Sequence, residues 1–124
     1  MKSIYGTYTA WEVKRLNWYE ARVYCNLTGG HLAAFETAAE YDAIRQQIPE
    51  AFPLAIGLND HDVEGVWRWE HNGQLLGAYS GFDPNSPDGG LLENCTRIKN
   101  HTWADVPCQK PFSGILCEYD NWQG

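Results

Sequence analysis

Two short segments of the chain concentrate side-chain oxygens, the ligands that a hard cation such as Ca²⁺ takes at about 2.3–2.6 Å. The first segment spans 59–65 and places Asp60, Asp62 and Glu64 at alternate positions. The second segment follows some twenty residues later. Its polar residues are Asp83, Asn85, Asp88, Glu93 and Asn94. Both segments are compatible with a metal site and with ordinary solvated turns.

The first segment imitates half of an EF-hand loop, because its acids alternate and a glycine, Gly65, follows them. The twelfth position of such a loop is a bidentate Glu, whereas this chain has His71 there, and no helix is predicted on either side. An EF-hand is therefore excluded. The segment is either a solvated acidic turn between two strands or a metal site of another kind.

The second segment, up to Asp88, lies in a long stretch, 77–92, that is rich in Gly, Pro, Ser, Asp and Asn and has no hydrophobic periodicity. Loops of that length inside a compact domain are usually functional. The sequence Asp83-Pro84-Asn85 is also an ordinary turn sequence. A ligand role and a turn role both remain open from the residues alone.

Enzymatic motifs are missing from the sequence. It contains no G-x-S-x-G, H-E-x-x-H, P-loop or Gly-rich dinucleotide turn, and its four histidines lack the spacing of a zinc site. We therefore expect a binding protein and no enzyme.

Length and charge narrow the class of partner. The 124 residues favour one domain, and the formal net charge of −7, with no basic stripe, disfavours nucleic acid and anionic membrane surfaces. No apolar run approaches the roughly 20 residues of a membrane-spanning helix.

The four cysteines, Cys25, Cys95, Cys108 and Cys117, form no C-x-x-C pair. Their even number in an aromatic-rich domain predicts two structural disulfides and an extracellular setting. Three Asn-x-Thr sequons give weak support to the same setting. Spacing alone leaves all three possible pairings open.

Two helices are predicted from capping boxes. The first begins at Asn17, three residues before Glu20, and ends at Gly29-Gly30, with Cys25 on its buried face. The second begins at Thr37 and should run for about three turns to Pro49, with Tyr41, Ile44 and Ile48 on one face.

Short strands are predicted around the helices and after them. They span 8–13, 31–35, 54–58, 66–69, 95–98, 103–106 and 114–119, with a hairpin turn at Asn72-Gly73. Trp18, Trp67, Trp69 and Trp103 fall on helix or strand faces and are predicted to be core residues.

The order of these parts resembles a C-type lectin-like domain over about 8–119, so that 1–124 would form a single domain. The segments that carry the resemblance are Trp18-Tyr19-Glu20-Ala21 with Cys25, Gly30-His31-Leu32-Ala33, Ile56-Gly57-Leu58, Trp67-Arg68-Trp69, Asp83-Pro84-Asn85, Glu93-Asn94-Cys95, Trp103-Ala104-Asp105 with Cys108, and Gly114-Ile115-Leu116-Cys117-Glu118. The resemblance implies an α+β double-loop fold: two helices flank small antiparallel sheets, and a long loop forms the ligand surface. It also implies the disulfides Cys25–Cys117 and Cys95–Cys108.

For function, the resemblance implies a secreted, Ca²⁺-dependent lectin domain that binds carbohydrate. A homo-oligomer of such domains would gain avidity. The sugar-site ligands would be Asp83, Asn85, Glu93 and Asp105. An auxiliary Ca²⁺ site would use Asp60 and Glu64, with Glu93 and Asn94 approaching from the other loop, and His101 would touch the ligand. The acid-Pro-amide order of Asp83-Pro84-Asn85 implies a mannose-type preference, for equatorial vicinal hydroxyls.

Three features depart from the pattern of the sugar-binding members. Asp83 is shorter than the usual Glu or Gln, 86–90 lengthens the loop, and Ala104 stands where an Asn ligand would be. Ala104 removes one metal ligand and one hydrogen-bond donor to the sugar. The alternative is therefore a metal-independent member of the same fold that binds a protein or another surface.

Overall fold

The computed structural model describes residues 2–5, 7–35, 37–48, 53–76, 93–99 and 102–119. The first helix, α1 (Trp18–Leu27), begins at the predicted capping box. The Asn17 side chain accepts a hydrogen bond from the Glu20 backbone N–H (2.9 Å), and the Glu20 carboxylate accepts one from the Asn17 N–H (2.9 Å). Its buried residues are Trp18, Ala21 and Cys25, as their spacing predicted. Gly29 ends the helix region with a φ of 98°, which favours glycine.

The second helix, α2 (Ala38–Arg45), also begins at its predicted capping box but is shorter than expected. The chain leaves the helix in a turn in which the N–H groups of Gln47 and Ile48 both donate to the Ile44 carbonyl. Ile48 is still buried. Pro49 prevents the helix from continuing past this turn, because a proline disfavours helical backbone in the residue before it.

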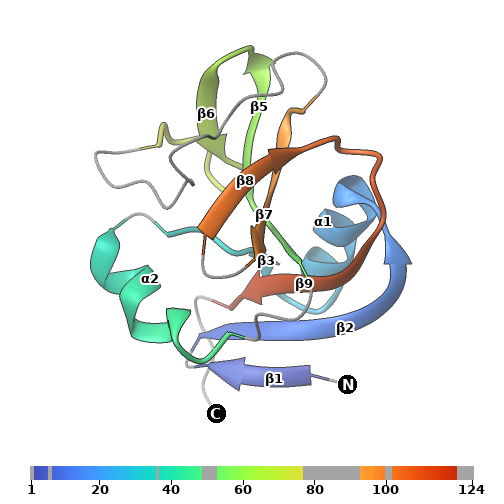
Figure 1. Cartoon of the computed structure of the whole chain (residues 1–124), viewed down its shortest axis with the longest axis vertical. Helices are drawn as coiled ribbons and strands as arrows, with labels where there is room; N and C mark the ends of the chain where they lie inside the picture. The colour runs from blue at the N-terminus through green and yellow to red at the C-terminus, as the bar shows by residue number, and fades with distance from the viewer. Residues whose placement is uncertain are drawn as a thin grey trace.

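The strands form one large mixed sheet and one hairpin (Figure 1). The large sheet has the order β1-β2-β9-β4-β7-β8, with β3 paired to β9, and the hairpin is β5-β6. The bounds are β1 Lys2–Tyr5, β2 Tyr8–Leu16, β3 His31–Leu32, β4 Leu54–Ile56, β5 Leu58–Val63, β6 Val66–Trp69, β7 Cys95–Lys99, β8 Thr102–Val106 and β9 Phe112–Glu118. The α+β fold class is confirmed.

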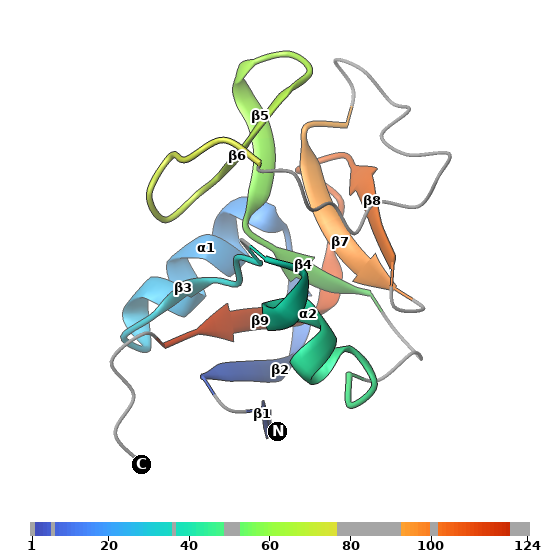
Figure 2. The same ribbon diagram turned by 90° about the vertical axis from the view of Figure 1, so that its left-hand side faces the viewer.

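The two helices lie on different sides of the molecule, while β5-β6 and β7-β8 rise from the same end of it (Figure 2). This end carries the candidate site. No helix in the described part of the chain has the length and apolar character to span a membrane.

The strands differ from the prediction in several places: β1 was not predicted, and the predicted strand 31–35 is shortened to β3. The predicted strand 54–58 divides at Gly57 into β4 and β5, and the acidic segment interpreted as a turn is itself strand up to Val63. Gly57 is tightly packed, because a Cβ there would lie 3.1 Å from the carbonyl oxygens of Leu32 and Ala33. The acids hid this strand, because Asp and Asn are depleted in strands.

The core is aromatic. Trp18, Trp69 and Trp103 are almost fully buried, as predicted, while Trp67 is only partly buried against the same core. The disulfides are Cys25–Cys117 and Cys95–Cys108, the pairs that the resemblance implied. The first ties α1 to β9, and the second ties the start of β7 to the turn after β8.

Candidate metal centre

The centre of the site is Asp60, which β5 places beside β7. The Asp60 N–H donates a hydrogen bond of 3.1 Å to the Asn94 carbonyl, immediately before β7. On β7 itself, the Thr96 hydroxyl donates to the Leu58 carbonyl at 2.7 Å. These contacts hold the acidic half of β5 against β7. Asp60 is only 2% exposed, so it is no solvated turn residue.

The two carboxylate oxygens of Asp60 have different surroundings. Oδ2 accepts a hydrogen bond of 2.8 Å from the backbone N–H of Gly65. Oδ1 is buried and accepts no hydrogen bond from the described residues while Glu64 is ionised, whereas a protonated Glu64 shares a hydrogen bond with this carboxylate. A buried carboxylate oxygen without a partner is costly, so such an atom needs a further ligand or a nearby positive charge.

Glu64 lies close to Asp60, and the charge of Asp105 also acts on Glu64. The pKa of Glu64 is raised, first by partial loss of solvation, then by the charge of Asp60, a hydrogen bond with Asp60 and the charge of Asp105. Asp105 lies in β8, opposite Thr96 in β7, and is itself only 4% exposed. Acids from β5, the β5-β6 turn and β8 therefore repel one another in one place.

This donor set suits a hard divalent cation. Every side-chain ligand that the three acids offer is a carboxylate oxygen, which Ca²⁺ prefers, and a divalent charge would offset the repulsion that raises the pKa of Glu64. The unpartnered Oδ1 of Asp60 is the specific atom that a cation would satisfy. The residues present therefore fit Ca²⁺.

The other predicted ligands divide into two groups. Glu93 and Asn94 are partly buried and directly precede β7, so the chain brings them to the same end of the molecule as Asp60. Asp83, Asn85 and His101 lie outside the described residues, as does Asp88. Ala104 is half-buried next to Asp105 and lies opposite Arg97 in the β7-β8 pair.

Sequence reasoning gave no role to His61, which contacts α1 on the other side of β5. Its ring lies 5.1 Å from that of Trp18, and its Nε2 lies 3.2 Å from the Tyr19 hydroxyl and 3.1 Å from Cys108 Sγ. Cys95 Sγ is also close, at 3.6 Å, but both sulfurs belong to one disulfide, so the three residues form no zinc site. Predicting 59–63 as a strand would have revealed this contact, because alternate side chains then face α1.

A family model described as "Lectin C-type domain" matches residues 14–119. Perlucin from Haliotis laevigata is 36% identical over 107 residues, which cover 80% of this chain and 67% of perlucin. Three other relatives are matched over only 20–47% of their own length, so this chain spans less than half of each.

Two solved structures extend the comparison. The carbohydrate-recognition domain of cow CD23, solved in the presence of a GlcNAc2Man3 oligosaccharide, is 26% identical with a TM-score of 0.79, and the match covers 94% of this chain and 90% of that one. A calcium-independent type II antifreeze protein is 25% identical with a TM-score of 0.75, and the match covers 94% of this chain and 88% of that one. The family model and perlucin together establish that this chain belongs to the C-type lectin domain family, whose members are not enzymes.

Proposed function

We propose that this domain binds carbohydrate through Ca²⁺, with a preference for mannose-type sugars. The observation that carries the proposal is the group formed by two buried acids, Asp60 and Asp105, and the exposed Glu64 between them in charge coupling, in which Asp60 Oδ1 accepts no hydrogen bond from the described residues while Glu64 is ionised. The oligosaccharide present with the similar CD23 domain supports a sugar as the ligand class.

In this proposal the acids divide between two ions. Asp60 and Glu64, with Glu93 and Asn94, hold an auxiliary Ca²⁺ that fixes β5 against β7. Asp105 and Glu93, with Asp83 and Asn85, hold the Ca²⁺ that meets the sugar. The bound ion supplies direct coordination of two vicinal hydroxyl groups.

The protein side chains orient those hydroxyl groups. Carboxylates accept hydrogen bonds from them, while the Asn85 amide donates. In Asp83-Pro84-Asn85 the accepting carboxylate comes before the donating amide. We base the proposed preference for mannose-type sugars on this order. His101, which precedes β8 in the sequence, would contribute a contact to the sugar.

Both disulfides are closed in this fold, so we further propose that the domain works in an oxidising, extracellular setting as a secreted protein. Single sugar sites of this kind are weak, at about millimolar Kd. Useful avidity then calls for several copies, as in a homo-oligomer.

A second candidate function follows from Ala104. The residue next to the buried Asp105 has no side-chain oxygen, so the sugar-site Ca²⁺ would lack one ligand. The similarity to a calcium-independent antifreeze protein fits a domain of this fold that binds its partner without metal. That partner would be a protein or another surface.

A glycan array separates the two candidates. It is run once with Ca²⁺ and once with chelator. Binding to mannose-type glycans that chelator abolishes supports the proposal. Binding that chelator leaves unchanged, or binding to galactose alone, contradicts it.

A further inference from the structure

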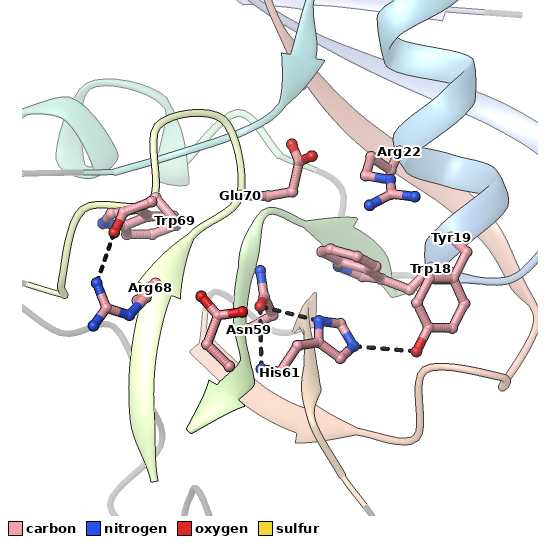
Figure 3. A pocket seen from close by; sticks show the side chains of 10 residues that line it. Trp18, Tyr19, Arg22, Asn59, His61, Arg68, Trp69 and Glu70 are labelled. Carbon is pink, nitrogen blue, oxygen red and sulfur yellow. Dashed lines mark hydrogen bonds between the residues drawn. The ribbon is translucent and has the colours of Figure 1, made fainter. Parts of the chain in front are cut away.

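A cavity of about 300 Å³ lies between α1 and the β5-β6 hairpin, on the α1 side of β5 (Figure 3). Helix α1 contributes Trp18, Tyr19 and Arg22, and the hairpin contributes Asn59, His61 and Arg68. Glu70, just after β6, completes the opposite wall. None of the residues predicted as metal ligands lines this cavity. It is thus a separate feature from the acidic cluster.

One wall of the cavity is fixed in place by hydrogen bonds. Trp18 Nε1–H donates to the Ile56 carbonyl at 2.8 Å, which locks its ring. The Asn59 amide oxygen accepts from the His61 backbone N–H (3.3 Å) and lies 3.0 Å from His61 Nδ1. An amide oxygen only accepts, so Nδ1 carries the proton, and Nε2 of the neutral ring accepts from the Tyr19 hydroxyl. These side chains form a rigid aromatic wall.

By contrast, the charged groups of Arg22 and Glu70 are not held by hydrogen bonds or ion pairs to other described residues. The Arg22 guanidinium lies 5.9 Å from the centre of the Trp18 ring, and it has no hydrogen bond or ion pair with any residue that the structure describes. The Glu70 backbone is anchored by its N–H, which donates to the Gly57 carbonyl at 2.8 Å. Its carboxylate has no hydrogen bond or ion pair with any residue that the structure describes. In Figure 3, Arg22 and Glu70 both lie above the Trp18 ring, with Glu70 to the left of Arg22.

Arg68 adds a second set of donors on the hairpin side. One of its terminal nitrogens donates to the Gly73 carbonyl at 3.0 Å, which fixes the guanidinium. Its Nε is buried without an acceptor among the described residues. The exposed carboxylate of Asp62 also lines the cavity, so two cations and two anions line it in total.

The presence of both arginines and carboxylates in the lining indicates the class of ligand. An anion would meet Glu70 and Asp62 as well as the arginines, and a cation would meet both arginines. A neutral ligand that carries hydroxyl groups avoids both repulsions. Each hydroxyl can donate a hydrogen bond to a carboxylate and accept one from an arginine. An aromatic side chain offers a surface for the apolar C–H face of a ring. Ligand pockets measure roughly 300–1,000 Å³, so this one suits a small ligand.

We propose that this cavity is a second, metal-independent binding site for one neutral sugar residue. Arg22 and Arg68 donate to its ring or hydroxyl oxygens, Glu70 accepts from its hydroxyls, and the partly exposed Tyr19 ring, which the buried Trp18 supports from behind, packs against the sugar ring. The site is separate from the Ca²⁺ proposal, because none of its side chains is a predicted metal ligand. The two proposals can therefore fail independently.

The test uses two-dimensional NMR on the isotope-labelled chain in excess chelator, titrated with the methyl glycosides of mannose, glucose and galactose. The expected result is saturable shifts centred on Trp18, Arg22 and His61, with little change at Asp60 and Asp105. Because the readout is local and uses the unaltered chain, it does not depend on the folding of a variant. Shifts that require Ca²⁺ and centre on Asp60 overturn this proposal while supporting the Ca²⁺ site. Absence of any saturable shift in chelator also overturns it.

Variants then identify which side chains bind the sugar. Arg22→Gln and Glu70→Gln should each weaken the affinity about tenfold, because each removes a hydrogen bond to a charged group. Arg15→Gln and Glu12→Gln are matched controls on the exposed side of β2 and should leave the affinity unchanged. Equal affinity in all four variants contradicts the proposal.

A zwitterion is an alternative class of ligand for this cavity, and a competition experiment tests it separately. Free glycine carries both charges and also complements Arg22 and Glu70. Glycine that competes with the glycosides at equal concentration would overturn the assignment to a sugar, whereas failure to compete supports it.

Discussion

Asp60 and His61 are adjacent in β5, and their side chains lie on opposite faces of that strand. The Asp60 carboxylate contacts Gly65 and Glu64, whereas the His61 ring contacts Trp18 and Tyr19 of α1. Successive side chains of a strand point to opposite faces, so one short strand can support two separate sites. This relationship leads to the predictions below.

Glu64→Gln should make the metal-free domain more stable than the original at neutral pH. The pKa of Glu64 is raised in the folded state, so its favourable contribution is present below the ordinary pKa and is lost as pH rises through the raised value. The difference in Tm between variant and original, measured in chelator, should therefore grow in favour of the variant from about pH 4 to about pH 7. A constant or shrinking difference contradicts the proximity of the acids.

The His61 ring should titrate below its ordinary pKa of 6.5. Burial is the largest cause; Arg22 lowers the pKa further, while Asp60 and Asp62 oppose the shift. Because the folded pKa is lowered, the stability that His61 contributes is present above about pH 6.5 and is lost as pH falls through the lowered value. An NMR titration of the ring checks this, and a midpoint at or above the ordinary value would contradict it.

The disulfides should contribute unequally to stability. Cys25–Cys117 joins residues 92 apart in sequence, and Cys95–Cys108 joins residues 13 apart. Chain-entropy arguments give about 4–5 kcal/mol for the longer loop and about 3 kcal/mol for the shorter. Urea unfolding of the two double Cys→Ala variants measures both costs. A larger loss for the Cys95/Cys108 variant would show that local packing, and not loop closure, dominates.

Ala104→Asn should strengthen the binding of both Ca²⁺ and sugar. The substitution restores an oxygen ligand and an amide donor next to Asp105, and β8 already holds position 104 partly exposed. The matched control is Ala104→Val, which adds bulk without a ligand atom. Equal affinities in the two variants would indicate that position 104 does not face the ion.

Much of the fold was predictable, because its signals are local. Both capping boxes, the buried face of α1 and most strands follow from the spacing of polar and apolar residues. Cys25 could be placed on the buried face for the same reason.

The site was less predictable, because it depends on contacts distant in sequence. The repulsion among Glu64, Asp60 and Asp105 arises from β5 and β8, which lie about 40 residues apart. The strand character of 59–63 was hidden by its acids, and with it the contact between His61 and α1. Neither feature has a local sequence signal.

The central claim is that Asp60 and its neighbours bind Ca²⁺, and calorimetric titration of Ca²⁺ into the chelator-treated domain tests it most directly. The account predicts binding heat and a rise in Tm for the original chain, and loss of both in Asp60→Asn. The control Asp42→Asn, at a carboxylate that is 61% exposed on α2, should behave like the original. No heat from the original chain, or equal heat from Asp60→Asn, would contradict the account.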